Sequence, residues 1–375
     1  MKKILIMPDS FKGSLTAGEF CRIARQRLKE VFGDRYDILS IPMADGGEGT
    51  ADCFLALDGF ERICVTVHNA YMETVPAYYA LRGDTAVIEL AQAASLPSVK
   101  GREDPARTTT YGVGDMIADA VKRGVVNILL GLGGSCTNDA GCGMARALGT
   151  VFKDSDNNSF LPTGGTLDKV CSIDTTVTEK MLDKVKITAM CDVNNPLFGE
   201  NGAAYVFAPQ KGASPDKVRL LDDKLRAIAD LVKDISGEDL SGQPGAGAAG
   251  GTGFGVTALL KGELKNGTAL ILDTIGFDEL LEDTALILTG EGNFDAQSLS
   301  GKTVMGIADR ARKKDVPVVV ISGGSEQERN AYNRGVSAVY TTSFGPQSLE
   351  DAKNNIKRDL KRAVVNTARL IEINI

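Results

Sequence analysis

Six glycine-rich polar loops recur along this chain, each where a predicted β-strand ends and a helix is expected to begin. Their sequences are DSFKGS, MADGGEGT, GLGGSCTND, CDVNNP, TGEGNFDAQS and SGGS. Strands that alternate with helices in this way predict a parallel sheet covered by helices. Open sheets of that kind bind ligands at the carboxyl ends of their strands. The recurrence therefore limits the chain to an α/β fold with a site made of loops.

The length of 375 residues and a change of texture along the chain predict two domains. The chain ends show simple alternation, whereas the segment after about residue 60 has several strand-like runs without helical spacing. We predict that residues 1–65 and 284–375 form one discontinuous Rossmann-like or flavodoxin-like domain with a parallel sheet. Residues 66–283 should form an inserted α/β domain with a mixed sheet, and the active site should lie in the cleft between the two.

Two helix starts are marked by their capping residues. Thr16 is followed three residues later by Glu19, which is the pattern of a capping box. Ser214 is followed by Pro215, and proline favours the first position of a helix. We therefore expect helices to begin directly after Thr16 and Ser214.

Composition argues against several classes of function. A net charge of -7 and a pI near 5.1 disfavour nucleic-acid binding, which depends on a surplus of Lys and Arg. The apolar run in MKKILIMPDS is too short for a signal peptide, and no run approaches the ~20 residues of a membrane helix. Seven scattered cysteines without a C-x-x-C pair predict a reduced, cytoplasmic protein. Whether the protein forms a homo-oligomer stays open on the sequence.

His68 is the only histidine in the chain, which excludes zinc sites built on two or more histidines. It lies at the end of a predicted strand that runs into a turn, and we expect a structural or surface role for it. General-base chemistry should then fall to Asp, Glu or Lys.

The six loops contain the groups that phosphoryl transfer uses. Glycine-rich backbone at a helix N-terminus binds phosphate, and loop carboxylates suit Mg²⁺. Lys12 and Lys302 add positive charge against the transferring phosphate. Taken singly, Asp9, Asp139 and Asp295 are better read as helix caps or turn formers. The recurrence of Gly, carboxylate and hydroxyl at six strand ends favours the functional interpretation.

Two short motifs are near misses. The segment TGEGNFDAQSLSGKT ends like a P-loop, but Ala296 stands where that loop requires glycine. The segment GAGAAG at 245–250 has the spacing of a dinucleotide fingerprint, yet it follows a polar stretch and not a strand. We predict neither motif, and we place the ligand on the GEG-x-x-D-x-Q portion of the first segment.

In their order along the chain, six segments resemble the motifs of the bacterial type I glycerate kinases. They are DSFKGSLTA, MADGGEGT, GGSCTNDAG, CDVNNPL, PGAGAAGGTG and TGEGNFDAQSLSGKT. The resemblance implies two α/β domains, one of them Rossmann-like, and transfer of the γ-phosphoryl group of ATP to D-glycerate with Mg²⁺, giving 2-phosphoglycerate. Two positions depart from the family pattern: Asn293 stands where arginine is usual, and Ala140 where glycine is frequent.

Residue chemistry at the matched positions supplies candidate roles. The catalytic candidates are Lys12 and Asp192. The substrate-binding candidates are Ser14, Asp45, Glu48, Ser135, Asn138 and Asn194. The candidates for binding ATP are Gly133, Gly134, Gly250, Gly251, Gly253, Gln297 and Lys302. The metal candidates are Asp192, Glu291 and Asp295. Lys12 should contact the transferring phosphate or the glycerate carboxylate, and Asp192 should bind the metal or take the proton of the attacking hydroxyl.

Two other functions stay open on the sequence. A kinase of another small hydroxy acid or sugar acid would need the same phosphate-binding loops. A non-catalytic metabolite sensor would use the loops for binding alone. Against the sensor, the sequence has no basic pair of DNA-binding helices, and many loop carboxylates are a poor way to hold an anion without a metal.

Overall fold

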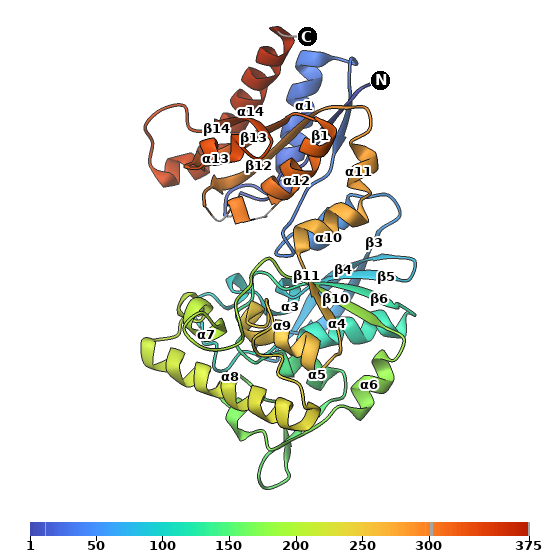
Figure 1. The fold of residues 1–375 in the computed structure, drawn as a ribbon, viewed down its shortest axis with the longest axis vertical. Coiled ribbons are helices and arrows are strands. Elements are labelled where there is room, and N and C mark those ends of the chain that lie inside the picture. The colour runs from blue at the N-terminus through green and yellow to red at the C-terminus, as the bar shows by residue number, and fades with distance from the viewer. Residues whose placement is uncertain (12, 297, 301–302, 374–375) are drawn as a thin grey trace. The chain divides into compact units, whose positions relative to one another are not determined.

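The computed structural model describes residues 1–11, 13–296, 298–300 and 303–373 (Figure 1). It divides into two compact units, each described here by itself. The first unit comprises Met1–Asp45, Ala56–Asp58 and the chain from Thr268 onward, and the second comprises Gly46–Leu55 and Gly59–Gly267. Each unit has its own main sheet with helices packed against it. The predicted fold class is confirmed, while the exact domain ranges of the sequence analysis stay a prediction.

The first unit is built on a five-stranded sheet of order β14-β13-β12-β1-β2, in which all neighbouring strands are parallel. Its strands are β1 (Lys3–Ile6), β2 (Asp37–Ser40), β12 (Thr284–Phe294), β13 (Val318–Ser325) and β14 (Val336–Thr341). Its helices are α1 (Ala17–Phe32), α10 (Gly267–Thr274), α11 (Phe277–Leu280), α12 (Thr303–Ala311), α13 (Glu328–Tyr332) and α14 (Leu349–Ile373). This is the flavodoxin-like strand order, and its switch point lies between β1 and β12.

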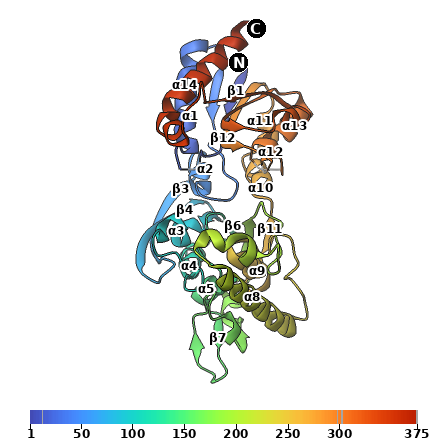
Figure 2. The ribbon, with the colours of Figure 1, turned by 90° about the vertical axis from the view of Figure 1, so that its left-hand side faces the viewer.

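Consecutive apolar residues in β1 show that both faces of this sheet are covered. Ile4 and Ile6 are buried in a cluster with Phe20 of α1 and Leu360 of α14. These two helices lie side by side on one face of the sheet, and α12 packs against β12 and β13 (Figure 2). Leu5 lies between the two isoleucines and points to the opposite face of the sheet, since successive side chains of a strand alternate. It is also fully buried, so this second face is covered as well.

The second unit is built on a six-stranded mixed sheet of order β11-β10-β6-β5-β4-β3. Four strands are parallel, and β4 and β3 continue the sheet as an antiparallel hairpin. The strands of this sheet are β3 (Glu61–His68), β4 (Thr74–Arg82), β5 (Thr85–Glu89), β6 (Asn127–Gly131), β10 (Lys186–Met190) and β11 (Glu263–Lys265). The strand-like runs after residue 60 are therefore this hairpin and β5, as the missing helical spacing predicted.

Helices and a second, small sheet complete the second unit. The helices are α2 (Thr50–Leu55), α3 (Ala91–Ala94), α4 (Tyr111–Lys122), α5 (Cys142–Ala147), α6 (Thr176–Leu182), α7 (Ala203–Phe207), α8 (Pro215–Ser236) and α9 (Ala248–Ala258). The small antiparallel sheet has the order β8-β7-β9, with strands β7 (Val151–Lys153), β8 (Ser159–Phe160) and β9 (Ser172–Asp174). The buried core of the second unit includes the large side chains of Tyr79, Phe152 and Phe254.

Two segments predicted as loops are strands instead. The TGEG segment continues β12 as far as Phe294, and the SGGS segment continues β13 as far as Ser325. Glu291 pairs with Ser322, and Asn293 pairs with Gly324. Glycine disfavours strands in general, but here the neighbouring strands are very close: a Cβ on Gly290 would lie 2.1 Å from the Ile321 carbonyl oxygen.

Both predicted helix starts are confirmed. The Thr16 hydroxyl accepts from the Glu19 amide at 3.1 Å, and the Glu19 carboxylate accepts from the Thr16 amide at 3.1 Å. At the start of α8 the Ser214 hydroxyl accepts from the Lys217 amide. Local hydrogen bonds thus fix where α1 and α8 begin.

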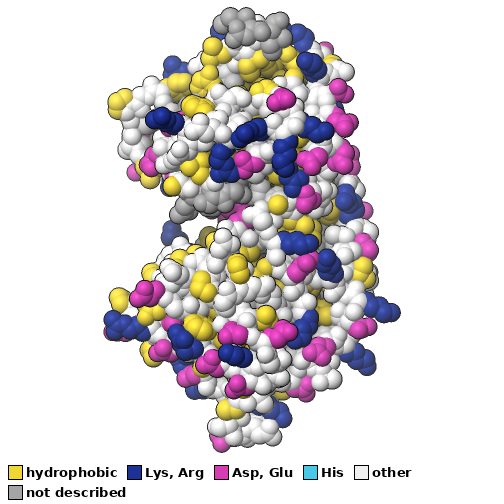
Figure 3. Space-filling view, in the orientation of Figure 1, with side chains coloured by type: hydrophobic (Ala, Val, Ile, Leu, Met, Phe, Trp, Pro, Cys, Tyr) yellow, Lys and Arg dark blue, Asp and Glu magenta, His cyan; other side chains and the backbone are white. Residues whose placement is uncertain are grey.

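Charged side chains of both signs are interspersed on the face shown in Figure 3. Among the described residues, the apolar stretches of the helices are too short or too interrupted by charge for any of them to cross a bilayer.

The capping box of α1 gives a stability prediction. Thr16→Ala removes the acceptor for the Glu19 amide, so the free energy of unfolding should fall by about 1 kcal/mol. Urea denaturation followed by circular dichroism measures this change. Thr16→Ser keeps the hydroxyl and should stay close to the wild type; an equal loss in both variants would contradict the capping role.

Candidate functional site in the strand-end loops

The parallel strands of the second unit end in one row. Glu89 of β5 pairs with Gly131 of β6, Gly131 pairs with Met190 of β10, and Met190 pairs with Lys265 of β11. The chain leaves the sheet at the same edge after each of these residues. The segments that follow them, including GLGGSCTND and CDVNNP, therefore start side by side.

The GGEG loop lies across this edge and is held by contacts that only glycine permits. The Gly133 amide donates to the Gly46 carbonyl oxygen at 3.1 Å. A Cβ on Gly133 would lie 2.4 Å from the Gly47 Cα atom, and one on Gly46 would lie 2.7 Å from the Met190 Cβ atom. Real Cβ atoms do not come so close to other atoms, so side chains here would push the loop off the strand ends.

A buried carboxylate holds the other end of the GGEG loop. Glu89 is 1% exposed, and its carboxylate accepts from the Ala51 amide at 2.5 Å and from the Gly49 amide at 3.3 Å. Burial raises the pKa of Glu89 to about 7, against the opposing effect of these two amides. Sequence reasoning missed this residue, although an acidic residue inside the apolar run AVIEL was a signal for it.

The loop after β6 is organised around Asp139. This carboxylate is fully buried and accepts from the Thr110 amide at 2.7 Å and the Thr110 hydroxyl at 2.9 Å. It also accepts from the Gly141 and Gly143 amides at 3.2 Å and from the Thr109 hydroxyl at 3.3 Å. Desolvation raises the pKa of Asp139, and the hydrogen bonds oppose that shift. Asp139 therefore has a structural role as a turn anchor.

Two predicted substrate ligands lie in this loop next to a lysine that sequence reasoning missed. Ser135 is 8% exposed and Asn138 is fully buried. The Lys211 ammonium, 2% exposed, donates to the Ser135 hydroxyl and to the Thr137 carbonyl oxygen, both at 2.7 Å. Burial lowers the pKa of Lys211 to about 8. No pattern in the polar segment APQKGASP marks this lysine as buried.

The glycine tract packs directly on the same loop. Gly250 and Gly251 have φ values of +67° and +89°, and a Cβ on Gly250 would lie 1.9 Å from the Thr137 carbonyl oxygen. The Ala140 amide donates to the Gly250 carbonyl oxygen at 3.1 Å. A Cβ on Gly253 would lie 2.1 Å from the Gly245 carbonyl oxygen. The predicted glycines 133, 134, 250, 251 and 253 thus belong to one set of contacting loops.

Asp192 stands after β10 and also contacts the start of α10. One of its carboxylate oxygens accepts from the Asn266 side-chain amide at 2.6 Å and from the Gly267 backbone amide at 2.7 Å. These bonds fix the orientation of the carboxylate. Asn194, two residues further on, has an exposed side chain, and so does Glu48 in the GGEG loop.

In the first unit, the segment after β1 lies against β12 at the switch point of the sheet. The Asp9 amide donates to the Gly290 carbonyl oxygen at 2.8 Å, and the Thr289 hydroxyl donates to the Met7 carbonyl oxygen at 2.7 Å. The Ser14 hydroxyl donates to the Phe11 carbonyl oxygen at 2.9 Å and closes the turn after β1. Ligands of flavodoxin-like sheets bind at this kind of edge.

The acidic candidates of the first unit lie in and just after β12. Glu291 is within the strand, and Asp295 follows its end. Asp295 accepts from the Ser298 amide at 3.3 Å and from the Asn293 side chain at 3.1 Å, so Asn293, the departure from the family pattern, helps to orient it. No group of three or more His, Cys, Asp or Glu side chains that could hold a metal occurs among the described residues.

Four further candidates have roles that the structure does not test. Lys12, Gln297 and Lys302 lie outside the described residues. Asp45 is half-buried and is the last residue of the first unit before the GGEG loop. Their predicted roles stay predictions.

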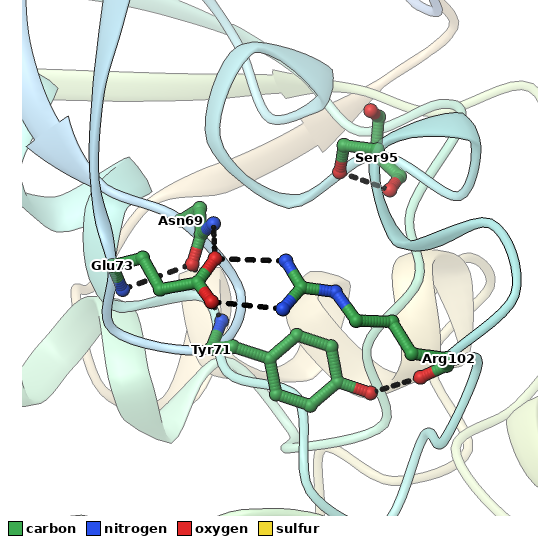
Figure 4. Close-up of polar contacts among 6 residues, drawn as sticks. Asn69, Tyr71, Glu73, Ser95 and Arg102 are labelled. Carbon is green, nitrogen blue, oxygen red and sulfur yellow. Dashed lines mark hydrogen bonds and ion pairs between the residues drawn. The ribbon is translucent and has the colours of Figure 1, made fainter.

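Two polar clusters near the site are structural contacts. The His68 ring nitrogen Nδ1 lies 2.8 Å from an Asp115 carboxylate oxygen, and the role expected for His68 stays a prediction. Figure 4 shows the second cluster, in which the Arg102 guanidinium makes two 2.8 Å bonds to the Glu73 carboxylate and stacks over the Tyr71 ring. Arg102 lowers the pKa of Glu73 to about 2. Both partners are exposed, and such surface pairs contribute little to stability.

The raised pKa of Glu89 predicts a pH dependence of stability. Its folded-state pKa of about 7 lies above the ordinary value of 4.5, so ionisation opposes folding as the pH rises through that interval. The free energy of unfolding of the wild type, relative to Glu89→Gln, should therefore fall by roughly 2–3 kcal/mol between about pH 5 and pH 8. Urea denaturation at several pH values measures the difference.

The matched control for Glu89 is Glu200→Gln, because Glu200 is exposed. It should show no comparable change relative to the wild type over the same pH interval. A pH-independent difference between the wild type and Glu89→Gln would contradict the prediction.

Comparison with known proteins gives a consistent result along the whole chain. The sequence pattern of the glycerate kinase family matches residues 4–372. The chain is 39% identical over 375 residues to the glycerate kinase of Bacillus cereus strain ATCC 10987, which covers 99% of this chain and 98% of that protein. It is 38% identical over 378 residues to the glycerate 2-kinase of Escherichia coli K12, with 100% and 99% of the two chains covered. A crystal structure of a Salmonella typhimurium LT2 protein assigned as glycerate kinase 2 aligns with a TM-score of 0.86 at 35% identity, with 100% and 99% covered. The chain therefore belongs to the glycerate kinase family, as the resemblance of its six motifs predicted.

Proposed function

We propose that this protein transfers the γ-phosphoryl group of ATP to D-glycerate and releases 2-phosphoglycerate and ADP. The observation that carries the proposal is the family match over residues 4–372, which includes all six glycine-rich segments. The Escherichia coli relative is named for phosphorylation at the 2-position, and this supports the choice of product. The substrates are two small molecules, and the proposal involves neither nucleic acid nor a membrane surface.

The loops favour phosphoryl transfer by positioning. In this reaction the protein mainly orients the donor and acceptor and stabilises negative charge. The second unit offers glycine-rich backbone held rigidly by Asp139, Glu89 and Lys211. The first unit offers the turn after β1 and the end of β12. We assign Ser135 and Asn138 to the acceptor acid, and Lys12 to the transferring phosphate or the glycerate carboxylate.

Mg²⁺ suits the carboxylates that these loops carry. Mg²⁺ binds through one or two protein carboxylates together with substrate phosphates, and a cluster of three acidic residues is not required. Asp192, Glu291 and Asp295 are the candidate ligands, each with the carboxylate oxygens that Mg²⁺ prefers, and a bound ion would neutralise charge on the phosphates of ATP. Asn266 and Gly267 orient the Asp192 carboxylate by hydrogen bonds. These bonds do not distinguish a metal ligand from a proton acceptor, so the role of Asp192 is tested by experiment.

All seven cysteines are free thiols, with no disulfide between them. This favours a reducing compartment, and we propose that the protein is cytoplasmic.

The reaction itself is tested by ADP release with a panel of hydroxy acids and sugar acids. We expect D-glycerate to be the best acceptor and turnover to require Mg²⁺. Phosphorus NMR of the product should show the 2-phospho isomer. Faster turnover of another acid would overturn the acceptor, and tight binding without turnover would favour a metabolite sensor.

The role of Asp192 is tested by Asp192→Asn, which keeps the shape and removes the charge. We expect kcat at saturating ATP and D-glycerate to fall by about 10²-fold or more, as for a positioned general base. The control is Asp183→Asn, because Asp183 is an exposed carboxylate just before β10. A loss below about tenfold would remove Asp192 from catalysis.

A further inference from the structure

Lys211 is a buried ammonium that no carboxylate neutralises directly. It is 2% exposed and ends the short turn Pro209–Lys211 between α7 and α8 (Figure 1). Among the ion pairs of the described residues, none includes Lys211. Burying a charge without an ion-pair partner is unfavourable, so a lysine kept at such a place calls for an explanation.

Both hydrogen bonds of the ammonium go to one short stretch of the β6 loop. It donates to the Ser135 hydroxyl and to the Thr137 carbonyl oxygen, each at 2.7 Å. Because an ammonium has three donors and no acceptor, these bonds orient the hydroxyl oxygen and the peptide group of the loop toward Lys211. The segment 135–137 is thereby fixed to the turn before α8.

Asn138 follows this braced segment and has an unusual environment. Its side chain is fully buried, and neither its amide nitrogen nor its amide oxygen has a hydrogen-bond partner among the described residues. Buried amides of proteins are nearly always hydrogen-bonded, and exceptions cluster where a site has a functional use. The loop that Lys211 holds therefore contains a buried polar group whose hydrogen-bonding capacity the described residues leave unused.

We propose that Lys211 is a positioning residue for the acceptor acid: its buried ammonium fixes residues 135–137 so that Ser135 and Asn138 are held for substrate binding. The inference rests on the proposed function, because it assigns Ser135 and Asn138 to the acceptor acid. Lys211 acts through the loop and does not itself take part in the transfer.

The main test is Lys211→Met, which keeps the length of the side chain and removes the ammonium. We expect KM for D-glycerate to rise by about tenfold or more, while KM for ATP changes by less than about twofold. The control is Lys217→Met, because Lys217 is a more exposed lysine on α8 that pairs with Asp104 at 3.0 Å. It should leave both constants unchanged.

A pH profile separates the charge of Lys211 from its bulk. The titratable groups near the Lys211 amine are the Asp139 carboxylate and the Cys136 thiol. Burial raises the pKa of Cys136 to about 12, so this thiol stays neutral over the pH range of the test. Burial lowers the pKa of Lys211 to about 8, so kcat/KM for D-glycerate should fall above that pH in the wild type. Lys211→Arg keeps its charge and should lose this decline.

The wild-type pH profile keeps the test decisive if Lys211→Met fails to fold, because a kcat/KM for D-glycerate that stays level above pH 8 would overturn the role of Lys211. Ser135→Ala removes one partner of the ammonium and should raise KM for D-glycerate selectively. Where both variants fold, combining them should add little to the larger single effect, because the two groups act as one unit. Unchanged kinetics in folded variants, or an equal rise in both KM values, would overturn the role of Lys211. Wild-type protein without activity on D-glycerate would instead overturn the proposed function.

Discussion

The buried carboxylate of Asp139 is the constraint on which the site of the second unit depends. A carboxylate removed from water must regain its hydrogen bonds within the protein. Asp139 does so through donors at both ends of a structural junction: Thr109 and Thr110 before α4, and Gly141 and Gly143 at the start of α5. Two helix starts and the loop after β6 are thus tied to one charge. The loop is fixed before any substrate arrives.

Close backbone packing at glycines also holds these loops in place. A Cβ on Gly143 would lie 2.0 Å from the Thr109 hydroxyl oxygen, and one on Gly250 would lie 1.9 Å from the Thr137 carbonyl oxygen. Loops that approach so closely exclude side chains between them and bring their backbone groups together. The 42 glycines are therefore concentrated partly where backbone packs on backbone, and this is the geometry that phosphate binding also requires.

Local signals made much of the fold predictable. The capping box at Thr16 and the Ser214 cap are properties of a few neighbouring residues, and each placed the start of its helix correctly. The prediction failed where neighbours in space decided the outcome. The glycines of TGEG suggested a loop, but pairing of β12 with β13 extends the strand through them. The small sheet β8-β7-β9 was also not foreseen, since its strands have only two or three residues.

The same distinction applies to the site. The loops were predictable because their composition is unusual and they recur at strand ends. Glu89 and Lys211 were not, because the sequence gives the identity of a charged residue but not its burial. Glu89 lies in an apolar run and could have been noticed, whereas Lys211 stands in a polar segment like any surface lysine. Only the fold shows that both carry their charge inside the protein.

Two buried groups of opposite sign, Asp139 and Lys211, hold different parts of the loop after β6. Asp139 holds the end of the loop through backbone amides, and Lys211 holds its middle through a hydroxyl and a carbonyl oxygen. An anion binds donors and a cation binds acceptors, so the two charges hold different polar groups of the loop. The Asn138 amide lies between these two anchors and bonds to neither of them. Under the proposed function, the free energy of fixing this loop is spent during folding and not when the acceptor acid binds at Asn138.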